Sequence, residues 1–96
     1  MSTRATRRAE NQELFRMGNV RLNDVVDGLV PADARLPFLC ECADEDCNGR
    51  VELERTRWES VAARAHHFVI VPGHAVTDGE LVVGSVEGFE IVRKPA

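Results

Sequence analysis

Three cysteines lie within eight positions in the stretch FLCECADEDCNGR, and the chain has no other cysteine. So dense a cluster indicates a disulfide, a reactive thiolate or a bound metal ion. The odd number of cysteines, and the small strained ring that a C-x-C pair closes, argue against a disulfide. A reactive thiolate is also disfavoured, because reactive cysteines prefer electropositive surroundings and these have acidic neighbours. Those neighbours are Glu41, Asp44, Glu45 and Asp46.

A metal ion suits the spacing better. Side chains at positions i and i+2 of an extended chain point to the same side, so Cys40 and Cys42 can converge on one ion while Glu41 faces away. A turn can then bring Cys47 back to the same point. Structural zinc sites take four Cys or His ligands in a tetrahedral arrangement. The three thiolates therefore predict a zinc site that needs one further ligand from elsewhere in the chain.

The chain has three histidines that could complete the shell. His66 and His67 follow a predicted helix, where a favourable interaction with its negative end is the simpler role. His74 follows Pro72-Gly73, a tight turn that would project the imidazole from the end of a strand. We therefore predict a Cys3His site whose closed shell leaves no position for water, so that Zn²⁺ is structural. The predicted ligands are Cys40, Cys42, Cys47 and His74.

The spacing of apolar residues predicts a long N-terminal helix over residues 5–29. One stripe of this helix is apolar, and Gly28 and Pro31 mark its end. The stripe consists of Phe15, Leu22, Val26 and Leu29. Residues 1–30 are therefore predicted as an amphipathic helix, and residues 36–96 as a small α+β zinc-binding domain.

Within residues 36–96, we expect a β-hairpin that carries the cysteines at its tip. Its strands are FLCECA and Val51–Leu53, with Asn48-Gly49 supplying positive φ in the turn. A short helix should follow, opened by a capping box between Thr56 and Glu59. Then come a strand at 68–71 and a C-terminal hairpin of strands 81–86 and 89–93, with a turn at 87–88.

Composition limits the possible functions. The 96 residues are 44% hydrophobic but only 5% aromatic, so the core is modest and benefits from a staple. The net charge of −4 disfavours broad binding to nucleic acids or anionic membranes, although Arg4, Arg7, Arg8 and Arg16 crowd the first helix. No apolar run reaches the roughly 20 residues of a membrane span, and no signal peptide is visible. The expected location is the cytoplasm, where structural disulfides are rare.

Several segments resemble a family of small actinobacterial proteins. They are NQELFRMGNVRL, FLCECADEDC, VEL…WESV and FVIVPGH, followed by a valine-rich strand that ends in VRK. Family members carry N-x-x-x-F-R-x-x-N-x-R-[IL], then F-x-C-E-C-A-D-x-x-C, then P-G-H. The resemblance runs from about residue 11 to residue 94, and it implies that the three cysteines and His74 occupy motif positions. The chain departs from the family at Arg57-Trp58-Glu59, usually Glu-Tyr-Glu, and at Val61-Ala62, usually Val-Arg.

These features predict a small zinc-stabilised interaction or regulatory module that acts by binding another macromolecule and not by catalysis. The expected partner is another protein, or a second copy met through the helix of residues 1–30. Nucleic-acid or transcription-complex binding through Arg4, Arg7 and Arg8 is an alternative, and a thiol-based redox or zinc sensor is another. We find no nucleophile–base pair, no phosphate loop, no small-molecule site and no deaminase-type H-x-E with P-C-x-x-C.

Overall fold

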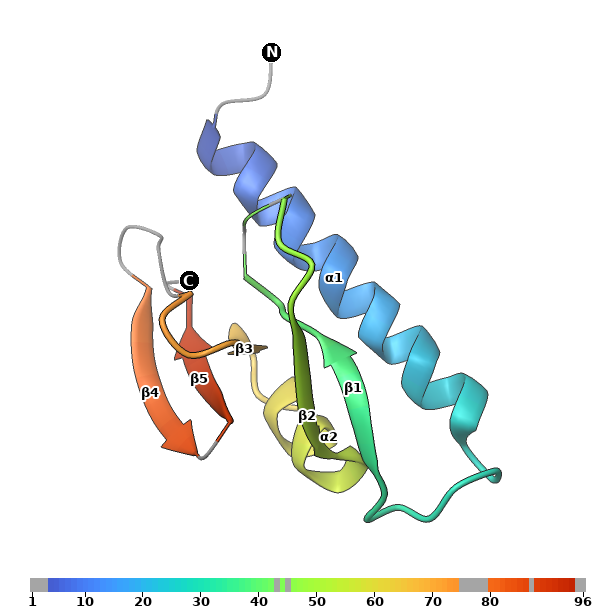
Figure 1. Ribbon diagram of the computed structural model, residues 1–96. Helices are drawn as coiled ribbons and strands as arrows, with labels where there is room; N and C mark the ends of the chain where they lie inside the picture. Colours follow the sequence, from blue (N-terminus) through green and yellow to red (C-terminus); the bar gives the residue numbers. More distant parts are fainter. Residues whose placement is uncertain (1–3, 43, 45, 75–79, 87, 95–96) are drawn as a thin grey trace.

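The computed structural model describes residues 4–42, 44, 46–74, 80–86 and 88–94, with side chains from residue 10 onward. Glu45 and Glu87 of the predicted turns, and the side chains of Arg4, Arg7 and Arg8, lie outside the described residues. The predicted α+β architecture is confirmed (Figure 1). The elements in chain order are α1 (Arg4–Val26), β1 (Arg35–Leu39), β2 (Arg50–Glu54), α2 (Arg55–Ala62), β3 (His67–Ile70), β4 (Leu81–Val86) and β5 (Phe89–Arg93).

The strands form two small antiparallel sheets. β1 and β2 form the predicted cysteine hairpin, with Arg35 opposite Glu54 and Leu39 opposite Arg50. The predicted strand FLCECA is wrong in its bounds, because β1 ends at Leu39 and the cysteines follow it. The second sheet has the order β3-β5-β4, so β5 is its central strand and β4 an outer one. In Figure 1, α1 runs along one side of the β1–β2 hairpin, while the β4–β5 hairpin lies on the opposite side. The predicted C-terminal hairpin is confirmed with the expected bounds.

The core lies between these layers and is built mainly from β-branched and aromatic side chains. Trp58 from α2 stacks on Phe38 from β1, with ring centroids 5.1 Å apart and an interplanar angle of 9°. Buried aliphatic residues from both sheets and from α2 surround this pair: Val51, Leu53, Val61, Val69, Ile70 and Val92. No helix in the described ranges is long and apolar enough to cross a membrane.

The side of α1 that faces the domain differs from the prediction. The most buried side chains of α1 are polar, namely Gln12, Asn19 and Asn23. The predicted apolar stripe lies at the margin of the interface and not at its centre, because the helix docks on groups that need hydrogen bonds. In that stripe Phe15, Leu22 and Val26 are partly buried, and Leu29 is 77% exposed.

Both helix boundaries also correct the sequence-based expectation. α1 stops at Val26 because Gly28 adopts a φ of +81°, and the N–H groups of Leu29 and Val30 then donate to the Val26 carbonyl. α2 begins at Arg55, and the residue before it, Glu54, makes no side-chain capping bond. The predicted capping box is therefore wrong.

A buried arginine joins the end of α1 to the start of α2. The side chain of Arg55 donates to the Asn23 side-chain and main-chain oxygens and to the Val30 carbonyl, at 2.9, 3.3 and 3.2 Å. It also pairs with Asp27 at 3.2 Å. The guanidinium thus satisfies carbonyls that the helix end leaves without partners, and it places positive charge at the negative end of the helix.

We expect Arg55→Met to lower the free energy of unfolding by about 2–3 kcal/mol, because buried oxygens lose their charged donor. Arg57→Met, two positions away on the exposed side of α2, is the matched control and should leave stability nearly unchanged. Chemical denaturation of both variants tests this, and equal midpoints would contradict the role assigned to Arg55.

Candidate metal centre

The structure brings together all four predicted ligand residues. Cys40, Cys42 and Cys47 lie in the segment between β1 and β2, and His74 lies just beyond β3. Their sulfur and imidazole nitrogen atoms all lie within 4.8 Å of one another. Neither His66 nor His67 belongs to this cluster, in agreement with the preference for His74.

The separations within the cluster match a tetrahedral shell. The Nδ1 atom of His74 lies 3.6 Å from Cys40 Sγ and 3.5 Å from Cys47 Sγ. A tetrahedral ion with the usual zinc–sulfur and zinc–nitrogen bond lengths would separate sulfur from nitrogen by about 3.5 Å. The four side chains therefore lie where one ion could contact all of them without a large rearrangement.

A tight turn positions His74. The His74 N–H donates to the Val71 carbonyl at 3.0 Å, and Gly73 between them has a φ of +87°. Proline in the second position and a glycine with positive φ in the third are typical of a type II turn. The Gly73 N–H donates to a Glu90 carboxylate oxygen at 2.7 Å, so β5 holds the turn in place. The predicted role of Pro72-Gly73 is confirmed.

Backbone N–H groups support two of the sulfur atoms. Cys40 Sγ accepts from Val71 N–H at 3.2 Å, and Cys47 Sγ accepts from Gly49 N–H at 3.4 Å. Such bonds orient thiolates and stabilise their charge. Cys40 and Cys42 are buried, whereas Cys47 and His74 are partly exposed. The centre therefore has a closed inner side and a side that faces solvent.

Gly49 is needed for close packing and not for its backbone conformation. Contrary to expectation, neither Asn48 nor Gly49 has a positive φ. A Cβ atom at Gly49 would instead lie 2.9 Å from a Val71 methyl group and 3.4 Å from Cys47 Sγ. The returning limb of the cysteine segment approaches the end of β3 this closely only because it carries no side chain there.

Glu41, between the first two cysteines, is fully buried and has a role that sequence reasoning missed. Its Oε1 accepts from Arg16 at 3.1 Å and from the Val69 N–H at 3.0 Å. Its Oε2 accepts from Arg16, Asn19 and the Trp58 indole at 3.0, 2.8 and 3.1 Å. Glu41 faces away from the other ligands as predicted, but it points into the interior, whereas its acidic neighbours Asp44 and Asp46 are exposed.

Hydrogen bonds also fix the main chain of Glu41, and further contacts fix the side chain of Arg16. The Glu41 N–H donates to the Val69 carbonyl at 2.8 Å, and its own carbonyl accepts from the Gln12 side chain at 3.2 Å. Arg16 also donates to the His67 carbonyl, and its guanidinium lies 4.5 Å from the centre of the Phe68 ring. The side chain of Arg16 is therefore largely buried and binds groups inside the domain.

The strand alternation of the C-E-C segment links the metal centre to the rest of the fold. Cys40 and Cys42 face the other ligands, while Glu41 between them binds α1, α2 and β3 at once. A displacement of the cysteine backbone would therefore also displace the carboxylate. The ligand cluster and the Glu41–Arg16 ion pair therefore both depend on the positions of Cys40, Glu41 and Cys42.

One pattern in the sequence indicates that α1 has a polar binding partner such as Glu41. The polar residues of α1 recur at i, i+4, i+7 and i+11, which places them on one face of a helix. They are Gln12, Arg16, Asn19 and Asn23. Two of them, Arg16 and Asn19, are also letters of the motif that carries the family resemblance. A polar stripe with helical period, rather than scattered polar residues, indicates a partner for that face.

In the metal-free protein the three thiols ionise differently. A hydrogen bond from the Cys42 thiol lowers the pKa of Cys40, with further help from the Val71 N–H and against the effect of burial. The pKa of Cys42 is raised, first by that same hydrogen bond and then by burial. Burial also raises the pKa of Cys47. Cys40 is therefore the first thiol to ionise, and metal binding must displace protons from the other two.

Comparison of the chain with protein-family models, with curated proteins and with solved structures finds no match. The assignment of the site therefore depends on its geometry and on the chemistry of its four side chains.

We expect Glu41→Gln to lower the free energy of unfolding of the metal-loaded protein by about 3–5 kcal/mol, because Arg16 loses its buried counter-charge. Denaturation followed through Trp58, the only tryptophan and a partner of the carboxylate, measures the effect directly. Glu52→Gln on the exposed face of β2 is the matched control. Equal midpoints for the two variants would contradict the role of Glu41.

A second expectation concerns pH. The raised pKa values of Cys42 and Cys47 keep both thiols protonated at neutral pH in the metal-free protein, so metal binding releases their protons. With Zn²⁺ as the probe ion, the apparent association constant should fall at least about 100-fold for each unit of decreasing pH near neutrality, because at least these two protons must leave. Competition with a chelator of known affinity at several pH values measures the slope, and a tenfold change or less would contradict the assignment.

Proposed function

We propose that this protein is a zinc-stabilised interaction module that acts by contact with another macromolecule. One observation carries the proposal: three sulfur atoms and one imidazole nitrogen converge from two loops, with Cys40 and His74 34 residues apart in the chain. The ligand set is complete without water, and such closed sites stabilise structure.

The donor set favours zinc over other common ions. Thiolate sulfur is a soft ligand that binds Zn²⁺ well, whereas Mg²⁺ and Ca²⁺ prefer carboxylate and carbonyl oxygen. The fit of the sulfur–nitrogen separations to a tetrahedron supports the same choice. Iron–sulfur clusters are usually held by four cysteines, and this chain has three.

The ion would clamp the tip of the β1–β2 hairpin to the turn after β3. These two parts belong to different sheets, and the backbone bonds between them centre on Glu41 and Val69. A chain of 96 residues buries only a modest core, so a metal bond across this junction would supply a large share of the folding free energy.

The surface outside the metal centre supports the binding role. Large apolar side chains are exposed on the outer side of α1, at Leu14, Met17 and Val25, and along β4. The polar side of α1 already faces the domain through buried Gln12 and Asn19. A partner or a second copy would therefore meet the outer side of α1 or the second sheet, and not the face that α1 uses internally.

Elemental analysis tests the metal assignment. Purified protein should contain one zinc ion per chain, because the four side chains form one complete shell. His74→Ala should reduce zinc retention during dialysis against a chelator by at least about tenfold, whereas His66→Ala, an exposed histidine outside the cluster, should behave like the wild type.

Thermal unfolding of the same proteins with and without chelator provides the second measurement. Chelation should lower the melting temperature of the wild type and of His66→Ala, because metal binding contributes to folding. A metal-free wild type with an unchanged melting temperature would contradict the proposal, as would equal zinc retention in both histidine variants.

A further inference from the structure

A basic groove lies between α2 and the second sheet. Its volume is about 230 Å³, and no acidic residue lines it. Arg57 and Arg64 make no ion pair with any residue that the structure describes. The floor of the groove is apolar and includes half-exposed Val83 of β4. We call this the α2 groove, and its lining consists mainly of Arg57, Ser60, Arg64, His67, Val83 and Ile91.

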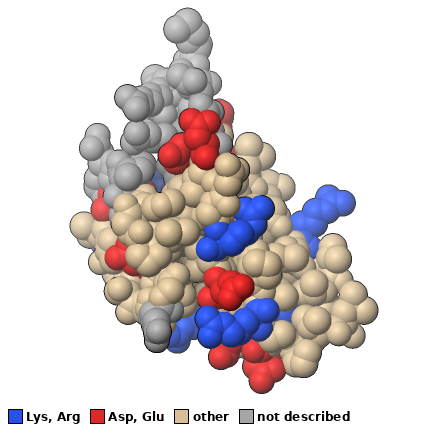
Figure 2. Space-filling view, viewed as in Figure 1, with Lys and Arg blue, Asp and Glu red and all other residues tan. Residues whose placement is uncertain are grey.

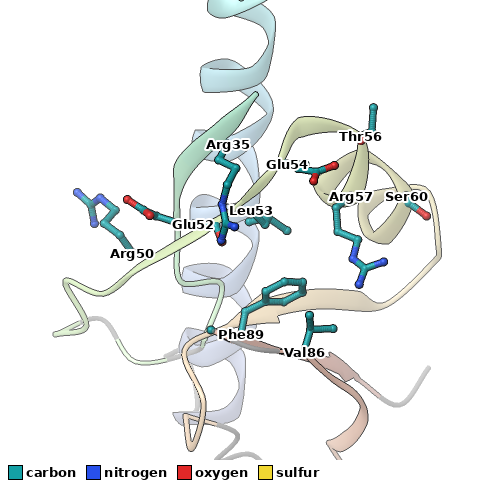
Figure 3. A pocket seen from close by; sticks show the side chains of 11 residues that line it. Arg35, Arg50, Glu52, Leu53, Glu54, Thr56, Arg57, Ser60, Val86 and Phe89 are labelled. Atoms are coloured by element: carbon teal, nitrogen blue, oxygen red, sulfur yellow. The ribbon is translucent and has the colours of Figure 1, made fainter. Parts of the chain in front are cut away.

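Arg57 also borders a second, larger hollow on its other side. This hollow has a volume of about 1030 Å³ and extends along β2, as Figure 3 shows. Arg57 reaches from α2 toward Phe89, with its guanidinium 6.0 Å from the centre of that ring. Arg35 approaches from the β1–β2 hairpin, but Glu52 and Glu54 line the same hollow. Of these two hollows, only the α2 groove is lined by basic residues without acidic ones.

The strand beside the α2 groove has an open edge. β4 is an outer strand of its sheet, and it has no strand partner on its outer side within the described residues. Leu81, Val82 and Val83 are 52, 47 and 49% exposed, and β4 contains no charged residue or proline. Edge strands are normally protected by charged residues, proline or bulges. β4 has a register irregularity between Val82 and Gly84 but no charged residue or proline, and its apolar side chains stay exposed, which suits a surface that another chain covers.

We propose that the α2 groove and the β4 edge bind an extended segment of a partner protein that combines acidic and apolar side chains. Its backbone would pair with β4, its apolar side chains would lie on Val83 and Ile91, and its carboxylates would meet Arg57 and Arg64. The inference rests on the proposed interaction function, and it specifies the surface and the chemistry of the partner.

Charge disfavours a second copy of the chain as the occupant. Two copies paired through β4 about a two-fold axis would place the same surface on itself, and so bring Arg57 and Arg64 of each copy toward those of the other. Like charges at such an interface are unfavourable. An acidic segment places opposite charge at the same positions.

The surface also suits a protein better than a nucleic acid. Single-stranded nucleic acids bind through stacking on exposed aromatic rings. Trp58 of α2 and Phe89 of β5 are each only 3% exposed. Figure 2 shows basic and acidic side chains alternating over the middle and lower part of the visible face, without a continuous basic stripe. Exposed valines instead match apolar side chains.

The test uses metal-loaded full-length protein and a fluorescein-labelled probe peptide of sequence EELLEEL, which as a strand carries acidic and apolar side chains on each face. A charge-reversed peptide of sequence KKLLKKL is the probe control. Fluorescence anisotropy should show saturable binding of the acidic peptide alone, weakened by added salt because charge pairs contribute. The double variant Arg57→Glu/Arg64→Glu should weaken binding at least about tenfold, because two attractive contacts become repulsive.

Two matched variants separate the contributions of the surface. Arg21→Glu, on the exposed outer side of α1, makes a charge reversal away from the groove and should leave binding unchanged. Val83→Glu, on the open edge of β4, removes an apolar contact and repels the acidic peptide, so it should weaken binding without loss of zinc or of thermal stability. The unchanged zinc content and stability of both variants verify that the effects arise at the surface and not from misfolding.

Each other outcome overturns the inference. Wild-type protein that does not bind the acidic peptide contradicts it, and so does binding that the double variant leaves unchanged. Arginine-dependent binding of a labelled DNA oligonucleotide in place of the peptide would assign the groove to nucleic acid. Dimerisation that Val83→Glu abolishes would assign the edge to a second copy. Zinc content separates these results from a failure of the proposed function. A protein that contains zinc but does not bind the peptide contradicts only the proposed binding surface.

Discussion

The ion pair between Glu41 and Arg16 is the interaction on which the rest of the structure depends. A carboxylate with no exposed surface is tolerated in a protein interior only when its oxygens are fully hydrogen-bonded. Here α1, α2 and β3 each supply donors to it. The carboxylate therefore fixes the positions of these three elements relative to one another.

The candidate metal centre and this ion pair share one short segment, residues 40–42, which follows β1. Alternate residues of C-E-C point in opposite directions, so sulfur faces the His74 turn and carboxylate faces the helices. A conventional small domain would fill both sides with aliphatic residues. This chain fills one side with metal ligands and the other with charge, which suits a composition that has few aromatic residues.

Local patterns predicted the parts of the fold that local interactions determine. Strand alternation located both hairpins, and the Pro72-Gly73 turn identified His74 among three histidines. The failures concern partners distant in sequence. No local pattern connects Gln12 and Asn19 to their partner Glu41, which lies more than 20 residues away. The close approach at Gly49 likewise depends on Val71, which no local rule connects to it.

The polar docking face of α1 also bears on how the chain is made. α1 leaves the ribosome before its partners in the hairpin and β3, which follow up to about 50 residues later. A helix whose docking face was wholly apolar would expose that face to other chains during this interval. The amide and guanidinium groups at the centre of the docking face can be hydrated until Glu41 is made, so this face, unlike the apolar outer side with Leu14 and Met17, adds little exposed apolar surface to the unfolded chain.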